Sequence, residues 1–266
     1  MLKDITLGQY FPGDSCIHKM DARVKILLSV VFMAVIFCIK SVYGYAALLA
    51  FTTFMIVLSK IPFGFMIKAI KPIMFFVVFT AILNVLFTRS GEVLLTVGFI
   101  TVTKDGLLYA AYMFIRIVFL VLGTSLLTYT TSPIELTDGL ERLLYPFSKI
   151  GLPSHELAMM MSIALRFIPT ILEETDKIMK AQTARGADFE SGNILKRAKA
   201  LIPLLVPLFI SAFRRADELA LAMECRCYHG GNNRTKMNEP KLGVCDFWAI
   251  VAFVIFVASI VLTNIF

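Results

Sequence analysis

Long apolar runs, separated by short polar stretches, fill the first half of the chain and its last 20 residues. A helix needs about 20 mostly apolar residues to cross a bilayer core of about 30 Å. The runs therefore predict five membrane spans, over residues 24–39, 42–58, 73–87, 107–127 and 247–266. The third run is short, but the long side chains of Lys68 and Lys71 at its start can extend to the polar interface. Residues 92–106 alternate weakly and contain Gly98, which predicts a small hairpin.

Residues 128–246 have a different pattern, in which dense charges alternate with apolar residues at helical spacing. The spacing predicts three helices, over about 134–148, 155–184 and 194–228, with Ser132 and Ser154 as caps of the first two. The apolar run 201–213 is too short to span and contains two prolines, so we expect a helix buried against other helices or at the membrane surface.

The predicted fold class is an all-α polytopic membrane protein with about five transmembrane helices and a module of three helices, two of them long and crossed. Its parts are a membrane domain over 1–127 with four spans, the module over 128–246, and a fifth span over 247–266. Lysine and arginine are richer in the N-terminal segment and in the loop after the second span than in the loops between. The positive-inside rule then places the N-terminus and the module in the cytoplasm and the C-terminus outside.

The amino-acid composition narrows the class of protein further. The chain is 58% hydrophobic with a mean hydropathy of +0.79 and a formal net charge of +7. In a membrane protein this charge indicates basic cytoplasmic loops rather than nucleic-acid binding. The five cysteines are odd in number and scattered, which does not suggest a secreted disulfide framework. The N-terminal segment is polar, so we do not expect a cleavable signal peptide there.

Motifs for catalysis are missing from the sequence. It has no phosphate-binding loop and no Gly-x-Ser-x-Gly elbow, and "HELAM" (155–159) has Met159 where a zinc protease has its second histidine. Cys225, Cys227 and His229 are three soft ligands within five residues, but cysteines at i and i+2 do not share a helix face and no fourth ligand is obvious. We therefore expect no catalytic residue, metal or cofactor.

Arg116 is the one ionisable residue deep in a predicted span. Charges in that position are costly and often functional. The alternative is that Arg116 ends a shorter span or extends to the outer interface, and both interpretations remain open.

Two segments share a pattern that ends in an arginine. Arg185 lies in Ala184-Arg185-Gly186, and Arg226 lies between Cys225 and Cys227. When the arginines are aligned, an aspartate lies nine residues before each, at positions 176 and 217, and alanines match at positions 181 and 222. A solvated arginine at a helix C-terminus is the simplest interpretation, but it does not require a second copy. Two copies suggest two equivalent sockets that bind the planar guanidinium, as a pair of similar cytoplasmic subunits would supply.

The stretches "TTSPIEL", "LRFIPTILEETDKIMKAQTARG" and "RRADELALAMECRCY" resemble the transmembrane T component of energy-coupling factor (ECF) transporters. The resemblance covers nearly the whole chain. It implies that the two arginine motifs dock on two ABC-type ATPase subunits, and that the long helices couple them to one or more membrane S components that capture the substrate. The second motif departs from the family because Cys225 and Cys227 replace small residues, and loss of a glycine can stiffen or shift the helix end.

The resemblance further implies a multi-pass, non-catalytic subunit of the cell membrane that binds no substrate itself and serves vitamin uptake. The alternatives are a subunit dedicated to a cobalt or nickel importer and a membrane-embedded enzyme. The first helix of the pair carries Met159, Met160, Met161 and Leu165, an adaptable surface for S components, although methionines also fill ordinary cores.

Overall fold

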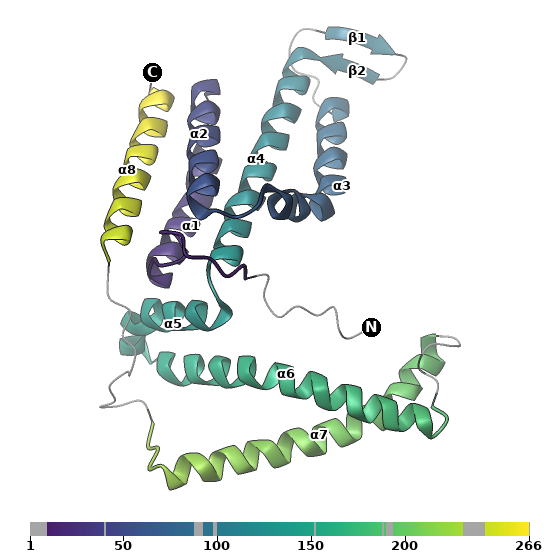
Figure 1. Ribbon diagram of the computed structural model, residues 1–266. Helices are drawn as coiled ribbons and strands as arrows, with labels where there is room; N and C mark the ends of the chain where they lie inside the picture. The colour runs from purple at the N-terminus through teal and green to yellow at the C-terminus, as the bar shows by residue number, and fades with distance from the viewer. Residues whose placement is uncertain are drawn as a thin grey trace. The chain divides into compact units, whose positions relative to one another are not determined.

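The computed structural model describes residues 10–39, 41–87, 93–97, 100–151, 153–187, 189, 194–230 and 243–265. These residues are almost entirely helical, with one two-stranded hairpin (Figure 1). The chain divides into two compact units, one formed by residues 8–139 and 240–266 and the other chiefly by residues 140–239. We call the first the membrane unit and the second the crossed-helix unit.

The membrane unit contains the five predicted apolar runs as helices. Its elements are α1 (Ala22–Cys38), α2 (Val42–Ser59), α3 (Phe63–Phe87), β1 (Val93–Val97), β2 (Ile100–Thr103), α4 (Lys104–Thr130) and α8 (Val244–Ile265). The third run is the C-terminal part of a longer helix, since α3 begins at Phe63 and continues through Pro72. The antiparallel pair β1–β2 confirms the predicted hairpin.

Five helices in the described part of the chain are long and apolar enough to cross a membrane, namely α2, α3, α4, α8 and α6 (Ser154–Ala184). The number agrees with the prediction, but the membership differs. The 17-residue α1 falls just short in length. The 31-residue α6, expected in the charged module, qualifies. Length and composition alone do not distinguish a span from a long amphipathic helix at the membrane surface.

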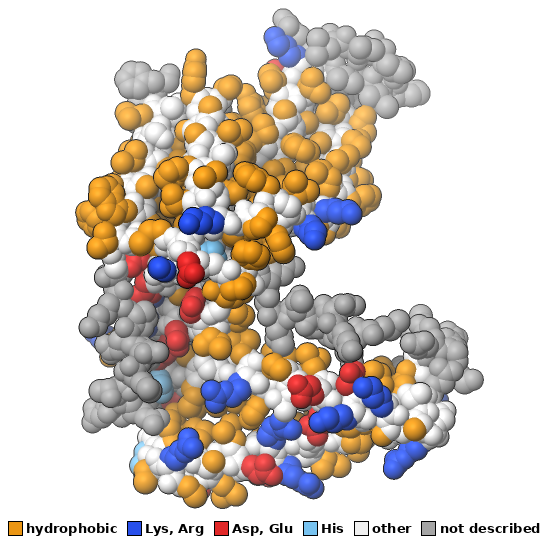
Figure 2. All heavy atoms as spheres, in the orientation of Figure 1, with side chains coloured by type: hydrophobic (Ala, Val, Ile, Leu, Met, Phe, Trp, Pro, Cys, Tyr) orange, Lys and Arg blue, Asp and Glu red, His pale blue; other side chains and the backbone are white. Residues whose placement is uncertain are grey.

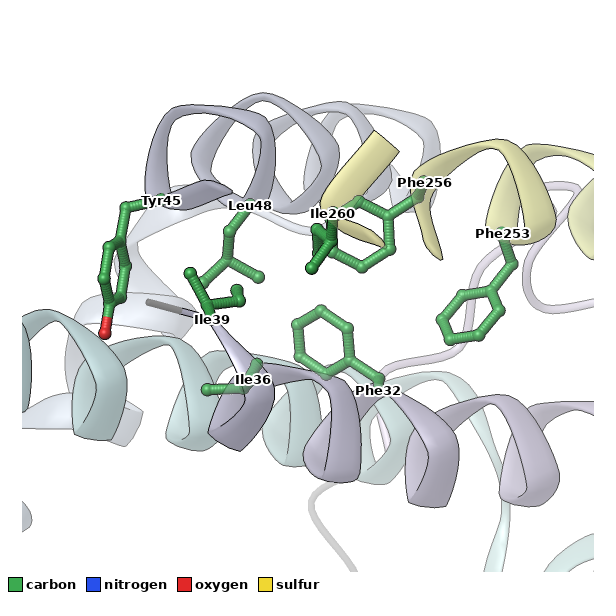
Figure 3. Close-up of a cluster of buried hydrophobic side chains, with 8 residues drawn as sticks. All are labelled: Phe32, Ile36, Ile39, Tyr45, Leu48, Phe253, Phe256 and Ile260. Carbon is green, nitrogen blue, oxygen red and sulfur yellow. The ribbon is translucent and has the colours of Figure 1, made fainter. Parts of the chain in front are cut away.

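Packing within the membrane unit centres on aromatic side chains. A buried cluster (Figure 3) consists of Phe32, Ile36, Ile39, Tyr45, Leu48, Phe253, Phe256 and Ile260. Phe51 of α2 stacks on Phe256 of α8, with ring centroids 4.2 Å apart. The outer surface of these helices is covered with exposed hydrophobic side chains (Figure 2), as lipid-facing helices require.

The segment before α1 is joined to the end of α4 and the start of α8 by buried polar contacts. The Lys25 ammonium donates hydrogen bonds to the carbonyl oxygens of His18 and Thr130, each at 3.0 Å. The Asp21 amide donates to a carboxylate oxygen of Asp246 at 2.9 Å. Cys16 and Cys245 form a disulfide across 229 residues of sequence, a pairing that the cysteine count did not suggest.

The crossed-helix unit contains the end of α5 (Pro133–Leu144), the 3-10 helix η2 (Tyr145–Ile150), α6 and α7 (Ile194–Cys225). The Ser132 hydroxyl accepts a hydrogen bond from the Glu135 amide, which confirms that predicted cap. The Ser154 cap was wrong, because Pro153 occupies the cap position and no side chain bonds there. The predicted first helix is also shorter, since residues 145–150 form η2.

α6 and α7 run in opposite directions and cross (Figure 1). The Arg215 guanidinium contacts the Glu174 carboxylate at 3.0 Å, and the Ser211 hydroxyl donates to the same carboxylate. The Gln182 side chain donates to the carbonyl oxygen of Pro203 at 3.4 Å. Because residue 174 lies opposite 211–215 and residue 182 lies opposite 203, the two long helices are antiparallel, which confirms the predicted pair.

Candidate functional site

α6 ends in a hydrogen-bonded turn around Arg185. The Gly186 amide donates to the Thr183 carbonyl at 2.9 Å, and the Ala187 amide donates to the Gln182 carbonyl at 3.0 Å. Gly186 has a φ of +89°, the left-handed conformation that favours glycine. This is a Schellman motif, in which two amides after the helix satisfy carbonyl groups of its last turn.

α7 ends in the same motif around Arg226. The Cys227 amide donates to the Glu224 carbonyl at 2.9 Å, and the Tyr228 amide donates to the Met223 carbonyl at 3.0 Å. Cys227 takes the place of Gly186 and has a φ of +56°. The helix therefore ends at Cys225, three residues earlier than predicted. Cysteine here forms the same hydrogen bonds as glycine does after α6, so the sequence repeat is also a repeat of the backbone hydrogen-bond pattern.

Both arginines project from these turns into the surroundings. Arg185 and Arg226 are exposed, as are their neighbours Ala184, Gly186 and Cys227. Neither arginine takes part in the ion pairs found among the described residues. Each helix end thus presents a guanidinium group whose N–H donors form no ion pair with a carboxylate of the described residues.

The two ends are well separated along the crossed helices. Gln182, near the end of α6, lies against Pro203 of α7. From Pro203 to Arg226 there are 23 residues, or about 35 Å at about 1.5 Å per residue. The two arginines therefore lie on well-separated parts of the helix pair.

The methionine surface lies on the first half of α6. Met160 and Met161 are 54% and 39% exposed, whereas Met159 and Leu165 are half-buried. α7 presents a larger exposed apolar face, which sequence reasoning treated as buried or membrane-bound. Its members include Leu201, Ile202, Leu205, Val206, Phe209, Ile210 and Phe213.

The remaining candidates have no catalytic arrangement in the described residues. His155 lies 3.0 Å from the Glu141 carboxylate, in a pair that joins α6 to α5. Cys225 and Cys227 are free and exposed. The described residues contain no group of three or more His, Cys, Asp or Glu side chains arranged to hold a metal ion.

Arg116 is not isolated in the membrane unit. Its guanidinium Nη2 donates to the carbonyl oxygen of Ile39 and to the Tyr45 hydroxyl, each at 3.2 Å. Sequence reasoning identified Arg116 but missed the side chains around it. The signal was present in α4, where Asp105, Tyr109, Tyr112 and Arg116 follow a helical spacing of i, i+4, i+7 and i+11.

Together, the apolar helices and the paired helix ends define a polytopic membrane protein that carries a duplicated arginine motif on a crossed pair of helices. Residues 13–237 match the family model described as "CbiQ: Cobalt transport protein". The chain belongs to this family.

Curated relatives bear a more specific name, "Energy-coupling factor transporter transmembrane protein EcfT". The Clostridium kluyveri protein is 57% identical over 266 residues, covering 100% of this chain and 98% of its own. The Acidaminococcus fermentans protein is 56% identical over 246 residues, covering 92% and 91%, respectively. The Bacillus subtilis protein is 48% identical over 258 residues and covers 97% of each chain. These names agree with the T component that the sequence motifs indicated.

Proposed function

We propose that the chain is the transmembrane coupling subunit of an ATP-driven ECF importer for a micronutrient. In this role it binds two ABC-type ATPases through Arg185 and Arg226, and it passes their motion to a substrate-binding S component. The observation that carries the proposal is the pair of equivalent helix ends, each with an exposed arginine on the same Schellman turn. The relatives' name supports the transporter assignment.

The geometry suits docking on two similar subunits. The two turns share one hydrogen-bond pattern, with an arginine at the same position of each, so one kind of socket can fit both. A planar guanidinium binds carboxylates through parallel hydrogen bonds, which fixes orientation as well as affinity. Because α6 and α7 are joined near Glu174 and Arg215, a movement of one helix end is transmitted to the other helix.

The apolar surface of the same two helices is the proposed contact for the S component. Met160 and Met161 on α6 and the exposed face of α7 are too apolar to remain in water. Methionine side chains adapt to partners of different shape, which favours a subunit shared among several S components. The family description mentions cobalt, and a dedicated cobalt or nickel importer remains the alternative; the S components that co-purify with the chain distinguish the two.

In the proposed topology the crossed-helix unit is cytoplasmic and α6 lies along the membrane surface rather than across it. The test uses single cysteines at Ser148 and Lys180, before and near the end of α6, in a variant without native cysteines. Both positions should react with an impermeant reagent only from the cytoplasmic side. Reaction of one from each side would show that α6 is a span.

Docking is tested by the Arg185→Ala and Arg226→Ala variants, singly and together, in cells that contain the ATPases. Loss of a charge-paired arginine at an interface costs about 2–5 kcal/mol, part of which comes from the partner charge left unpaired. Each single variant should retain less ATPase on co-purification, and the double variant should lose nearly all ATP-driven uptake in proteoliposomes. Lysine should restore function only in part.

Arg214→Ala is the matched control, because Arg214 is an exposed arginine in the middle of α7. It should assemble like the parent protein. Membrane insertion and monodispersity should be unchanged in all variants, since both docking arginines lie outside packed regions. If the double alanine variant binds ATPases and transports like the parent, the docking role is wrong.

The proposal also assigns ATP hydrolysis to the partners. The purified chain alone should neither hydrolyse ATP nor bind a vitamin tightly. ATP turnover by the isolated chain that survives removal of contaminating ATPases would contradict the role of a non-catalytic subunit.

A further inference from the structure

Helices of unequal length leave a hollow in the membrane unit. α1 and α4 are antiparallel neighbours, and the Lys25 ammonium near the start of α1 bonds the carbonyl of Thr130 at the end of α4. From Lys25 to Ile39 there are 14 residues, and from Thr130 back to Arg116 there are also 14. Arg116 is therefore level with the end of α1, and residues 104–115 extend beyond it by about 18 Å.

The hollow lies where α4 has passed the end of α1. Its walls come from one face of α4, and its base comes from the turn after α1 and the first turn of α2. The lining residues are Ile39, Tyr45, Asp105, Leu108, Tyr109, Tyr112, Met113 and Arg116. The volume of about 600 Å³ is in the range of small-molecule sites.

Arg116 brings to the hollow a positive charge that forms no ion pair with any described residue. Its two hydrogen-bond partners, the Ile39 carbonyl and the Tyr45 hydroxyl, are neutral. Its Nε is buried and has no hydrogen-bond partner, and none of the ion pairs among the described residues includes Arg116. A guanidinium in this state binds an oxyanion strongly, because charged donors form the stronger hydrogen bonds. Asp105, the carboxylate in the lining, is 11 residues away, or about 16 Å along α4.

The surroundings of the hollow match the headgroup level of a bilayer. Four of the chain's eight tyrosines are concentrated here, at positions 43, 45, 109 and 112. Tyrosines gather where membrane and water meet. Tyr45 stacks on Tyr112 with centroids 5.1 Å apart, and its hydroxyl is directed toward α4 (Figure 3). α1 also ends here, after only about 25 Å of helix, which is shorter than a bilayer core of about 30 Å.

We propose that this hollow binds the phosphate of an anionic phospholipid headgroup. Arg116 holds the phosphate through the Nη donors that Ile39 and Tyr45 leave unused. The acyl chains lie on the exposed apolar surface on the membrane side of the hollow, which includes Phe37 at 62% exposure. A bound lipid supplies the anionic partner that Arg116 lacks among the described residues, and fills the space beyond the end of α1.

The test is native mass spectrometry of the full-length chain in detergent with added palmitoyl-oleoyl phosphatidylglycerol. Dioleoylglycerol is the phosphate-free control lipid. Arg116→Gln should lower the affinity for phosphatidylglycerol about tenfold, and Arg116→Lys should lower it less, because the ammonium retains the charge without the fork. Lys71→Gln, which removes an exposed cation of α3, should change it by less than about twofold.

Because Arg116 also holds Ile39 and Tyr45, a second variant separates binding from folding. Leu108→Trp fills the hollow from an exposed position and removes no hydrogen bond, so it should abolish binding while the thermal unfolding temperature stays unchanged. Equal retention of dioleoylglycerol, or full binding by Arg116→Gln and Leu108→Trp, would refute the site.

Two further outcomes would assign the hollow to another ligand. Displacement of the lipid by millimolar inorganic phosphate would show a site for soluble anions rather than lipid. In the assembled transporter, loss of the lipid together with cross-linking from position 108 to a partner subunit would show that an acidic residue of that partner occupies the hollow.

Discussion

The two units of the molecule use apolar side chains in different ways. In the membrane unit, aromatic and aliphatic residues from α1, α2 and α8 meet in a buried cluster around Phe32 and Phe256. In the crossed-helix unit, the buried hydrophobic residues of the described parts of α6 and α7 are Ala158 and Leu204. Polar contacts around Glu174 join these two helices at their crossing, and much of the apolar surface of α7 is exposed.

This difference indicates which unit is stabilised by its own packing and which one needs partners or lipid to cover its apolar surface. Residues that pack on one another within a unit stabilise it without help. An exposed apolar face on a charged amphipathic helix indicates a surface that partner proteins or lipid cover. We therefore expect the membrane unit to respond to core substitutions as a folded domain does, and the crossed-helix unit to respond mainly through assembly.

The largest effect on stability should come from the aromatic cluster. Phe256 is 4% exposed and stacks on Phe51. Phe256→Ala should lower the free energy of unfolding in detergent by about 3 kcal/mol, because it leaves a cavity that its neighbours cannot fill. Phe54→Ala, on the exposed side of α2 at 52% exposure, is the matched control and should change it by about 0.5 kcal/mol or less. Equal losses for the two would mean that the cluster is not the core.

A smaller effect is expected at the crossing of α6 and α7. Glu174→Ala removes the ion pair with Arg215 and the hydrogen bond from Ser211, and both charged side chains are about 30% exposed. The cost should be about 1 kcal/mol, seen as faster amide hydrogen exchange in both helices near the crossing. The adjacent Glu173 is exposed, and Glu173→Ala should leave exchange unchanged. Unchanged exchange in Glu174→Ala would show that this contact does not hold the helices together.

An effect no larger than this one concerns the two helix ends, which have the same turn but different residues at the left-handed position. Cys227→Gly should stabilise the end of α7 by about 1 kcal/mol, because glycine adopts a positive φ without steric cost. Cys225→Gly, at the last helical position, should act in the opposite direction by about 0.5–1 kcal/mol. Hydrogen exchange of the Cys227 and Tyr228 amides reports both changes. Effects of the same sign would contradict the equivalence of the two turns.

Local patterns in the sequence were enough to predict most helices, the hairpin and the duplicated arginines. Apolar runs and helical spacing are properties of neighbouring residues, so they can be read without knowledge of the fold. The predictions of helix caps and helix ends that were wrong failed for local reasons too. The predicted Ser154 cap was wrong because Pro153 occupies the cap position, and the first helix of the charged region continues as η2 after Leu144.

Only the tertiary structure decided which distant residues meet. It joined Cys16 to Cys245, covered Lys25 with the carbonyls of His18 and Thr130, and placed Arg116 at the end of α1 beside Tyr45. It also showed that Cys227 adopts the conformation of Gly186, although cysteine has no preference for it. Helix lengths and helix packing set these contacts, and both depend on the whole chain rather than on any one segment. For that reason the sequence could identify Arg116 as an unusual charge, whereas the hollow beside this charge follows only from the different lengths of α1 and α4.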